Sequence, residues 1–205
     1  MCKLFNFNIF LCYNIFMKTA TIIHGMPFKD EEYYNPERPA SSNCHWIPWI
    51  QKQLLLKDVV AQAPEMPVPY NPEYNAWKNM FERLPLDEET ILIGHSCGGG
   101  FIVRYLSENN IKVGKVILVA PWIDTENFLS TGMFDFEIDE NIVNKTKNMT
   151  IFSSSNDMQS VKDSIEILKN KIKNIKVVEF ENMGHFCMED MKTEKFPELL
   201  KELDL

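Results

Sequence analysis

Short apolar runs of β type alternate with segments of helical periodicity along most of this chain. The predicted strands cover residues 19–24, 58–63, 90–94, 115–120, 150–154 and 176–180. The third and fourth runs are almost continuous Ile, Leu and Val, which is typical of strands buried on both faces of a parallel sheet. Strands that alternate with helices predict right-handed crossovers, and therefore a three-layer α/β/α sandwich around a six-stranded, mostly parallel sheet.

The segments between these runs carry the spacing of amphipathic helices. Trp77, Met80, Phe81 and Leu84, for example, follow the i, i+3, i+4, i+7 pattern. The predicted helices cover residues 45–56, 73–84, 97–109, 161–172 and 193–203. Residues 64–72 contain four prolines and are predicted to form a loop. Residues 121–147 form a long aromatic insertion, of the kind that often serves as a lid.

Residues 1–16 stand apart from this alternation. They are apolar but interrupted by asparagines, and their longest apolar run is far shorter than the roughly 18 residues that a membrane span needs. We interpret residues 1–16 as a loose extension, in preference to a targeting segment, and we expect no stable membrane insertion. Residues 17–205 then form a single domain, in line with a prior of about 150 residues per domain.

Composition and charge exclude several classes of function. Hydrophobic residues make up 45% of the chain and charged residues 24%, which is ordinary for a globular protein. The net charge is −8 and no basic stripe is present, so a nucleic-acid partner is not expected. Five widely spaced cysteines argue against a disulfide framework and favour a reducing compartment, for which we predict the cytoplasm. Neither CxxC nor HExxH occurs, so we expect no metal site and no cofactor.

The strongest chemical signal is GHSCG at residues 94–98, which matches G-x-S-x-G between a predicted strand and a predicted helix. Such a turn exposes the serine, Ser96, as a nucleophile, and glycines are needed on either side because side chains there would collide. The alternative is a helix start that merely packs tightly. A P-loop is excluded because no Lys follows the glycines, and Val103 breaks a dinucleotide fingerprint.

A serine nucleophile needs a base, and the chain has four histidines. His185 is the favoured base, because it follows the sixth predicted strand and reactive groups gather at the carboxyl ends of parallel strands. His24 ends the first strand and could also lie near the site. His95 is expected to point away from the serine, and His45 is assigned to the first predicted helix.

The base in turn needs a carboxylate that holds its tautomer. Asp157, after the fifth strand, is favoured; the alternative is a helix N-cap, and both roles can hold only if the side chain turns inward. Asp124, after the fourth strand, is the rival acid. The oxyanion hole is predicted to use the backbone N–H of Cys97 and that of Met26 in the loop after the first strand. The Cys97 thiol itself is interpreted as structural.

With these residues in place, the chain resembles the α/β-hydrolase superfamily, and more closely the small, nearly capless serine hydrolases related to retinoblastoma-binding protein nine. The resemblance covers residues 18–203 and rests on HGMP, the Trp46-x-x-Trp49 pair, ETILIGHSCGG, KVILVAPW, the acid segment and NMGHF. It implies a compact six-stranded core with minimal cap and a Ser-His-Asp triad at Ser96, His185 and Asp157. The acid segment SSSNDMQSV departs from relatives, which often have a second Asp and a Pro there.

The leading functional hypothesis is hydrolysis of an ester, thioester or amide of a small acyl substrate through an acyl-enzyme. The aromatic insertion suggests an apolar acyl pocket. One alternative is a protein-binding module with little or no activity, which would engage a protein partner through exposed aromatics such as Tyr33, Tyr34 and Tyr70. Another is a transferase or a C–C bond hydrolase that uses the same triad.

Overall fold

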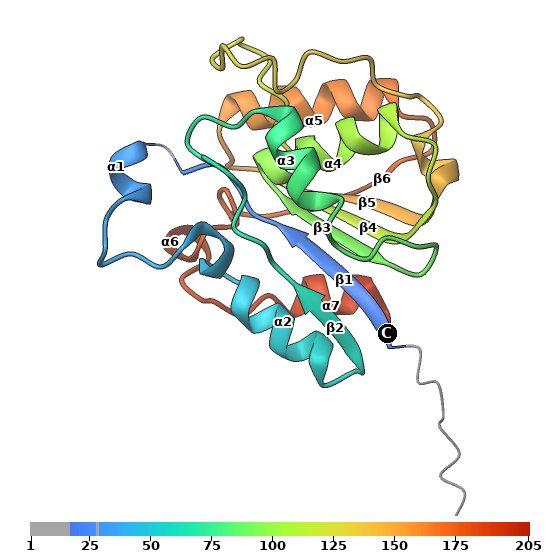
Figure 1. Ribbon diagram of the computed structural model, residues 1–205, viewed down its shortest axis with the longest axis horizontal. Coiled ribbons are helices and arrows are strands. Elements are labelled where there is room, and N and C mark those ends of the chain that lie inside the picture. The colour runs from blue at the N-terminus through green and yellow to red at the C-terminus, as the bar shows by residue number, and fades with distance from the viewer. Residues whose placement is uncertain (1–16, 28) are drawn as a thin grey trace, which may run out of the picture.

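Six parallel strands form one sheet in the computed structural model, which describes residues 17–27 and 29–205 (Figure 1). The strands are β1 (Lys18–Ile23), β2 (Val59–Gln62), β3 (Ile91–His95), β4 (Val113–Val119), β5 (Thr146–Ser154) and β6 (Lys176–Phe180). All six predicted strands are therefore confirmed, and every neighbouring pair is parallel. The interpretation of residues 1–16 as a loose extension lies outside the described residues.

The helices complete the predicted three layers. They are α1 (Asp30–Tyr33), α2 (Ile47–Leu55), α3 (Tyr74–Phe81), α4 (Cys97–Glu108), α5 (Gln159–Lys171), α6 (Met188–Met191) and α7 (Pro197–Leu203). Helices α3, α4 and α5 cover one face of the sheet, and α2 and α7 cover the other (Figure 1). The two shortest helices, α1 and α6, were not predicted, because four residues are too few to show a helical period.

The order of strands places a crevice above the carboxyl ends of β1 and β3. The sheet runs β2-β1-β3-β4-β5-β6, so the chain first moves from β1 to one edge and then returns past β1 to build the rest of the sheet. In open α/β sheets, ligands bind outside the carboxyl ends of the strands where the strand order reverses. The fold therefore points to the loops after β1 and β3 as the place for a site.

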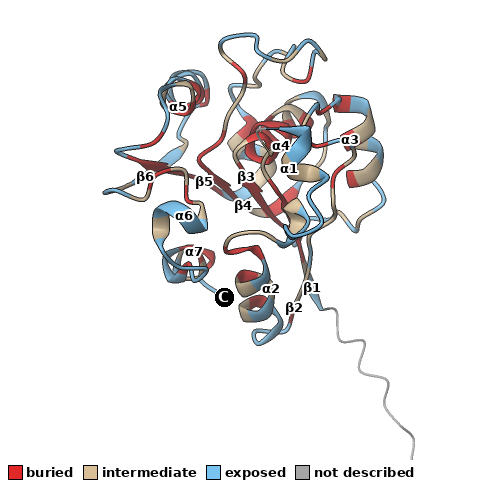
Figure 2. Cartoon of the chain, turned by 90° about the vertical axis from the view of Figure 1, so that its left-hand side faces the viewer, coloured by how far each residue is buried: buried red, intermediate tan, exposed pale blue. Residues whose placement is uncertain are grey.

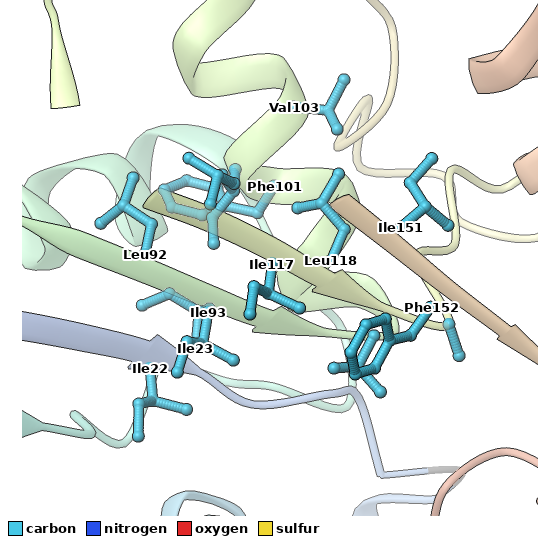
Figure 3. Close-up of a cluster of buried hydrophobic side chains, with 14 of the residues drawn as sticks. Ile22, Ile23, Leu92, Ile93, Phe101, Val103, Ile117, Leu118, Ile151 and Phe152 are labelled. Atoms are coloured by element: carbon cyan, nitrogen blue, oxygen red, sulfur yellow. The ribbon is translucent and has the colours of Figure 1, made fainter. Parts of the chain in front are cut away.

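The core lies on both faces of the central strands. Every residue of β3 is buried, and Figure 2 shows the strands as a largely buried band between half-buried helices. In Figure 3, Leu92 and Leu118 project toward the α4 side of the sheet, whereas Ile93 and Ile117 project to the other side. This alternation is why strands with continuous Ile, Leu and Val fill both interfaces of the sandwich.

Phe101 joins helix α4 to helix α3 in the upper layer. Its ring lies 5.8 Å from Tyr74, 5.7 Å from Trp77 and 5.4 Å from Phe81, measured between ring centroids. Burial of an aromatic side chain of this size contributes about 1.5–3 kcal/mol, and edge-to-face contacts add to it. The cluster fixes α4, which begins directly after Ser96.

None of the helices within the described part of the chain is both long enough and apolar enough to cross a membrane.

Replacement of Phe101 by Ala should lower the free energy of unfolding by roughly 3–5 kcal/mol, because a cavity remains where the ring was. Urea denaturation followed by circular dichroism measures this change. Phe128→Ala is the matched control: its side chain is 72% exposed, so the expected change is within about 0.5 kcal/mol. Equal destabilisation by the two substitutions would contradict this account of the core.

Candidate active site

Ser96 occupies a strained turn between β3 and α4. Its backbone has φ 53° and ψ −121°, in a region that residues with side chains rarely adopt. Hydrogen bonds hold it there: the Ser96 N–H donates to Val119 O at 2.9 Å, and Ser96 O accepts from the N–H groups of Gly99 at 2.9 Å and Trp122 at 3.1 Å. The turn is therefore fixed against β4 and the loop that follows β4.

Two glycines make this turn possible. A Cβ atom on Gly94 would lie 2.6 Å from the Cα atom of Gly99, and a Cβ atom on Gly98 would lie 2.3 Å from Ile23 O. Both contacts are with backbone, which cannot move aside without disruption of the sheet. The structure therefore shows why the G-x-S-x-G turn needs glycines: side chains at both positions would collide with backbone. Gly98 also lets the start of α4 pack against the end of β1.

His185 is hydrogen-bonded to Asp157. The His185 Nδ1 atom lies 3.0 Å from Oδ1 and 3.2 Å from Oδ2 of Asp157, whose side chain is fully buried. The Met158 N–H also donates to this carboxylate, at 2.7 Å. With Nδ1–H as the donor, the lone pair of the imidazole is on Nε2, which is the tautomer that a general base requires.

The rival carboxylate is engaged elsewhere. Asp124 accepts the backbone N–H groups of Phe128 at 2.7 Å and Leu129 at 2.8 Å, and so closes the turn after β4. It lines a different hollow from the one that contains His185. The geometry therefore favours Asp157 over Asp124 as the partner of the histidine.

Ser96, Asp157 and His185 line one cavity of about 980 Å³ at the carboxyl ends of the strands. Among the described residues, no hydrogen bond joins the Ser96 hydroxyl to the His185 ring. In unliganded enzymes such bonds are often long, and they tighten when substrate binds. The arrangement has the components of nucleophilic catalysis: a half-buried alcohol, an imidazole and a buried carboxylate.

The loop after β1 lies directly against Ser96. A Cβ atom on Gly25 would be 3.1 Å from the Cβ atom of Ser96, and Met26 lines the cavity. Cys97 is the first residue of α4, so its N–H has no partner within the helix. In the described part of the chain, neither this N–H nor that of Met26 donates a hydrogen bond. Both predicted oxyanion donors are therefore available beside the serine.

The thiol of Cys97 is fully buried, and burial raises its pKa well above the usual range. A thiol of this kind is inert, which agrees with its structural interpretation.

His95, which the sequence analysis gave no role in the site, and Asp190, which it did not single out, hold the loop of His185. The His95 Nε2–H group donates to His185 O at 2.8 Å, and Asp190 accepts the His185 N–H at 2.8 Å. Gly184, with φ 53°, leaves no room for a side chain, because a Cβ atom would lie 2.3 Å from Cγ of Asp190. In the sequence, only Gly184 indicates the contact between Asp190 and the loop of His185. Asp190 itself is an ordinary acidic residue in a helix that was not predicted.

The other two histidines also line the cavity. His24 donates from Nδ1 to Gly25 O at 2.7 Å and accepts the Met66 N–H at Nε2, at 2.9 Å, so both ring nitrogens serve the fold. The assignment of His45 to the first helix is wrong: α2 begins at Ile47, and His45 has φ 57°. Proline in the first turn sets that start, which leaves the His45 ring free to face α6.

Comparison with known proteins gives a consistent result. A serine hydrolase family model matches residues 36–204. YdeN of Bacillus subtilis (strain 168), a proposed hydrolase, is 30% identical over 128 residues, which cover 58% of this chain and 66% of YdeN. The alignment thus spans just under two thirds of that curated relative.

Solved structures extend the likeness to the whole fold. The structure of the ydeN gene product from B. subtilis has a TM-score of 0.74 and 26% identity, and the match covers 91% of this chain and 97% of that one. The esterase EaEST from Exiguobacterium antarcticum has a TM-score of 0.58 and 15% identity, with 91% of each chain covered. At that lower identity the likeness concerns the fold alone.

Acidification should destabilise the protein partly through His95. Burial, followed by the nearby charges of His185 and His45, lowers the pKa of His95 well below 6.5. Below about pH 6.5 the unfolded chain binds a proton at this position and the folded chain does not, so the unfolding free energy falls with pH by up to about 1.4 kcal/mol per pH unit. Above about pH 6.5, the contribution of the neutral His95 to the free energy of unfolding is fully present.

Urea denaturation at pH values on both sides of about 6.5 measures this slope. The slope should be shallower in His95→Gln, which keeps a donor for His185 O but does not titrate. The same slope in both proteins would assign the pH dependence to other groups.

Proposed function

Because the chain belongs to the serine hydrolase family and has the α/β-hydrolase fold, we propose that Ser96, His185 and Asp157 form its catalytic triad. The proposed reaction is hydrolysis of an ester, thioester or amide of a small acyl substrate. The hydrogen bond between His185 Nδ1 and the buried Asp157 carboxylate, in the cavity that also contains Ser96, carries this proposal. It supplies an oriented base beside an alcohol on a strained turn.

The mechanism follows from these positions. His185 Nε2 takes the hydroxyl proton as Ser96 Oγ bonds to the substrate carbonyl carbon, and Asp157 stabilises the imidazolium that results. The backbone N–H groups of Met26 and Cys97 bind the oxyanion, and each such donor is worth roughly 3–4 kcal/mol in the transition state. The imidazolium then protonates the leaving alcohol, thiol or amine. Water then attacks the acyl-enzyme with His185 as the base, and the carboxylic acid leaves as Ser96 regains its proton.

The cavity suits a small substrate. Its volume of about 980 Å³ lies at the upper end of what small-molecule sites usually offer. The aromatic insertion contributes Trp122 to the cavity wall, whereas Phe128 is exposed and the ring of Phe134 packs on Trp122 at 5.5 Å. An apolar acyl pocket would therefore depend on Trp122 rather than on the insertion as a whole.

We also propose the cytoplasm as the location of the protein. The three cysteines in the described residues, Cys44, Cys97 and Cys187, are free thiols, which supports a reducing compartment.

Substitution of Ser96 by Ala should abolish covalent labelling by a fluorophosphonate probe and lower kcat/KM for ester substrates by roughly 10⁴- to 10⁶-fold, because the nucleophile is lost. Ser160→Ala is the matched control, since Ser160 lines the same cavity but lies in α5. It should label at the wild-type rate. A wild-type protein that does not label would instead favour the protein-binding alternative.

Asp157→Asn should lower kcat by about 10⁴-fold with little change in stability, because an amide no longer holds the imidazole in the required tautomer. Asp124→Asn should leave kcat within a few-fold of wild type, since Asp124 serves the turn after β4. Steady-state kinetics on the two variants distinguish the acids, and a larger loss of kcat in Asp124→Asn would reverse the assignment.

A further inference from the structure

Three metal-ligand groups from two distant parts of the chain meet in the active-site cavity. They are a ring nitrogen of His45, Cys187 Sγ and a carboxylate oxygen of Glu189, and all lie within 4.8 Å of one another. All three residues line the cavity that contains Ser96 and His185. We propose that His45, Cys187 and Glu189 form a binding site for a divalent transition-metal ion, with Zn²⁺ as the ion of best-matched chemistry.

The donor set selects the class of ion. One imidazole, one thiolate and one carboxylate are the ligand types of Zn²⁺, whereas Ca²⁺ and Mg²⁺ prefer oxygen throughout. Burial and the nearby Asp190 and Glu189 carboxylates raise the pKa of the Cys187 thiol, so the ion would displace the thiol proton to solvent as the metal–sulfur bond forms. A thiolate ligand shifts the preference further toward softer ions. Three protein ligands leave the fourth tetrahedral position for water or a solute from the cavity.

The side chains need only small movements to close on an ion. Bonds of about 2.0–2.3 Å in a tetrahedral zinc site place the ligand atoms about 3.5 Å apart. The distance from His45 Nδ1 to Glu189 Oε2 is already 3.7 Å. The other pairs of ligand atoms lie within 4.8 Å of each other, and the Glu189 side chain, which is 67% exposed, can rotate without loss of packing.

The Nδ1 atom of His45 is unprotonated, as a metal ligand must be. The Met188 N–H donates to its Nδ1 at 3.2 Å, so this nitrogen carries the lone pair that a metal ligand needs. An ion would replace that long hydrogen bond with a coordinate bond. The His45 ring packs edge-to-face against the His95 ring, with a centroid separation of 5.9 Å and a near-perpendicular arrangement.

The electrostatic field in the cavity also favours a cation. Glu189, Asp190 and Glu194 line the cavity, and among the described residues Arg38 is the one Lys or Arg that lines it. Arg38 is itself paired with Glu32 at 3.4 Å. A cavity lined mainly by one sign of charge concentrates the opposite ion.

An ion at this site would connect the proposed catalytic loop to the segment before α2. Cys187 lies two residues after His185, and its Sγ–H donates to His185 O at 3.8 Å. His45, in contrast, lies just before α2, and its ring accepts a hydrogen bond from the Met188 N–H. Coordination would therefore join the two segments more firmly and place the ion in the cavity that contains Ser96.

Titration of the full chain with Co²⁺, in the presence of a reductant that does not bind metals, tests the proposal. Co²⁺ reports on Zn²⁺ sites because a thiolate ligand gives a charge-transfer absorption band. We expect one equivalent to bind and to produce this band. Cys187→Ser should abolish the band, and His45→Ala and Glu189→Gln should each weaken binding by about tenfold or more.

Matched controls separate this site from other thiols and from the proposed function. Cys44→Ser removes a neighbouring half-buried thiol and should keep the band, as should Cys2→Ser with Cys12→Ser. Ser96→Ala and His185→Ala should also keep it, whether or not the enzyme assays succeed. A wild type without the band, a band that survives Cys187→Ser, or a band lost in His185→Ala would overturn the proposal.

Discussion

The close contact between the start of α4 and the carboxyl ends of β1 and β3 is the constraint on which the site depends. The backbone of Gly98 lies so near Ile23 O that no side chain fits between them. The same turn holds Ser96 in a strained conformation, which costs about 1–3 kcal/mol. The cost is offset by burial along α4, where Phe101 packs among the aromatic rings of α3. Core packing and the placement of the Ser96 hydroxyl in the cavity are thus two consequences of one helix position.

Burial of the central strands and the parallel order of the sheet explain why so much of the architecture could be predicted from the sequence. The central strands are buried on both faces, so their apolar runs are continuous and easily distinguished. Because the sheet is parallel, the loops after β1, β3, β5 and β6 must open at the same edge. From this rule, Ser96, Asp157 and His185 were expected to lie close together, and they line one cavity. Their chemical roles stay a prediction.

What could not be predicted depends on partners that are distant in the sequence. The periodic pattern of the first helix includes His45, but proline in the first turn starts the helix later and turns the ring toward α6. Asp190 supports His185 through a backbone N–H, and such a contact leaves no periodic signal. The expected absence of a metal site rested on local motifs, whereas the proposed ligands come from segments that only the fold brings together.

The four histidines show that surroundings, rather than residue type, determine what an imidazole can do in this cavity. His24 has both ring nitrogens bonded to backbone, and His185 alone has a buried carboxylate partner. His95 lies 5.0 Å from His185, between ring centroids, and burial keeps its pKa low. A charged His95 at that distance would oppose the imidazolium that the proposed mechanism forms on His185. The neutral state of the buried ring therefore favours the proposed reaction, and it is also a cost to stability at low pH.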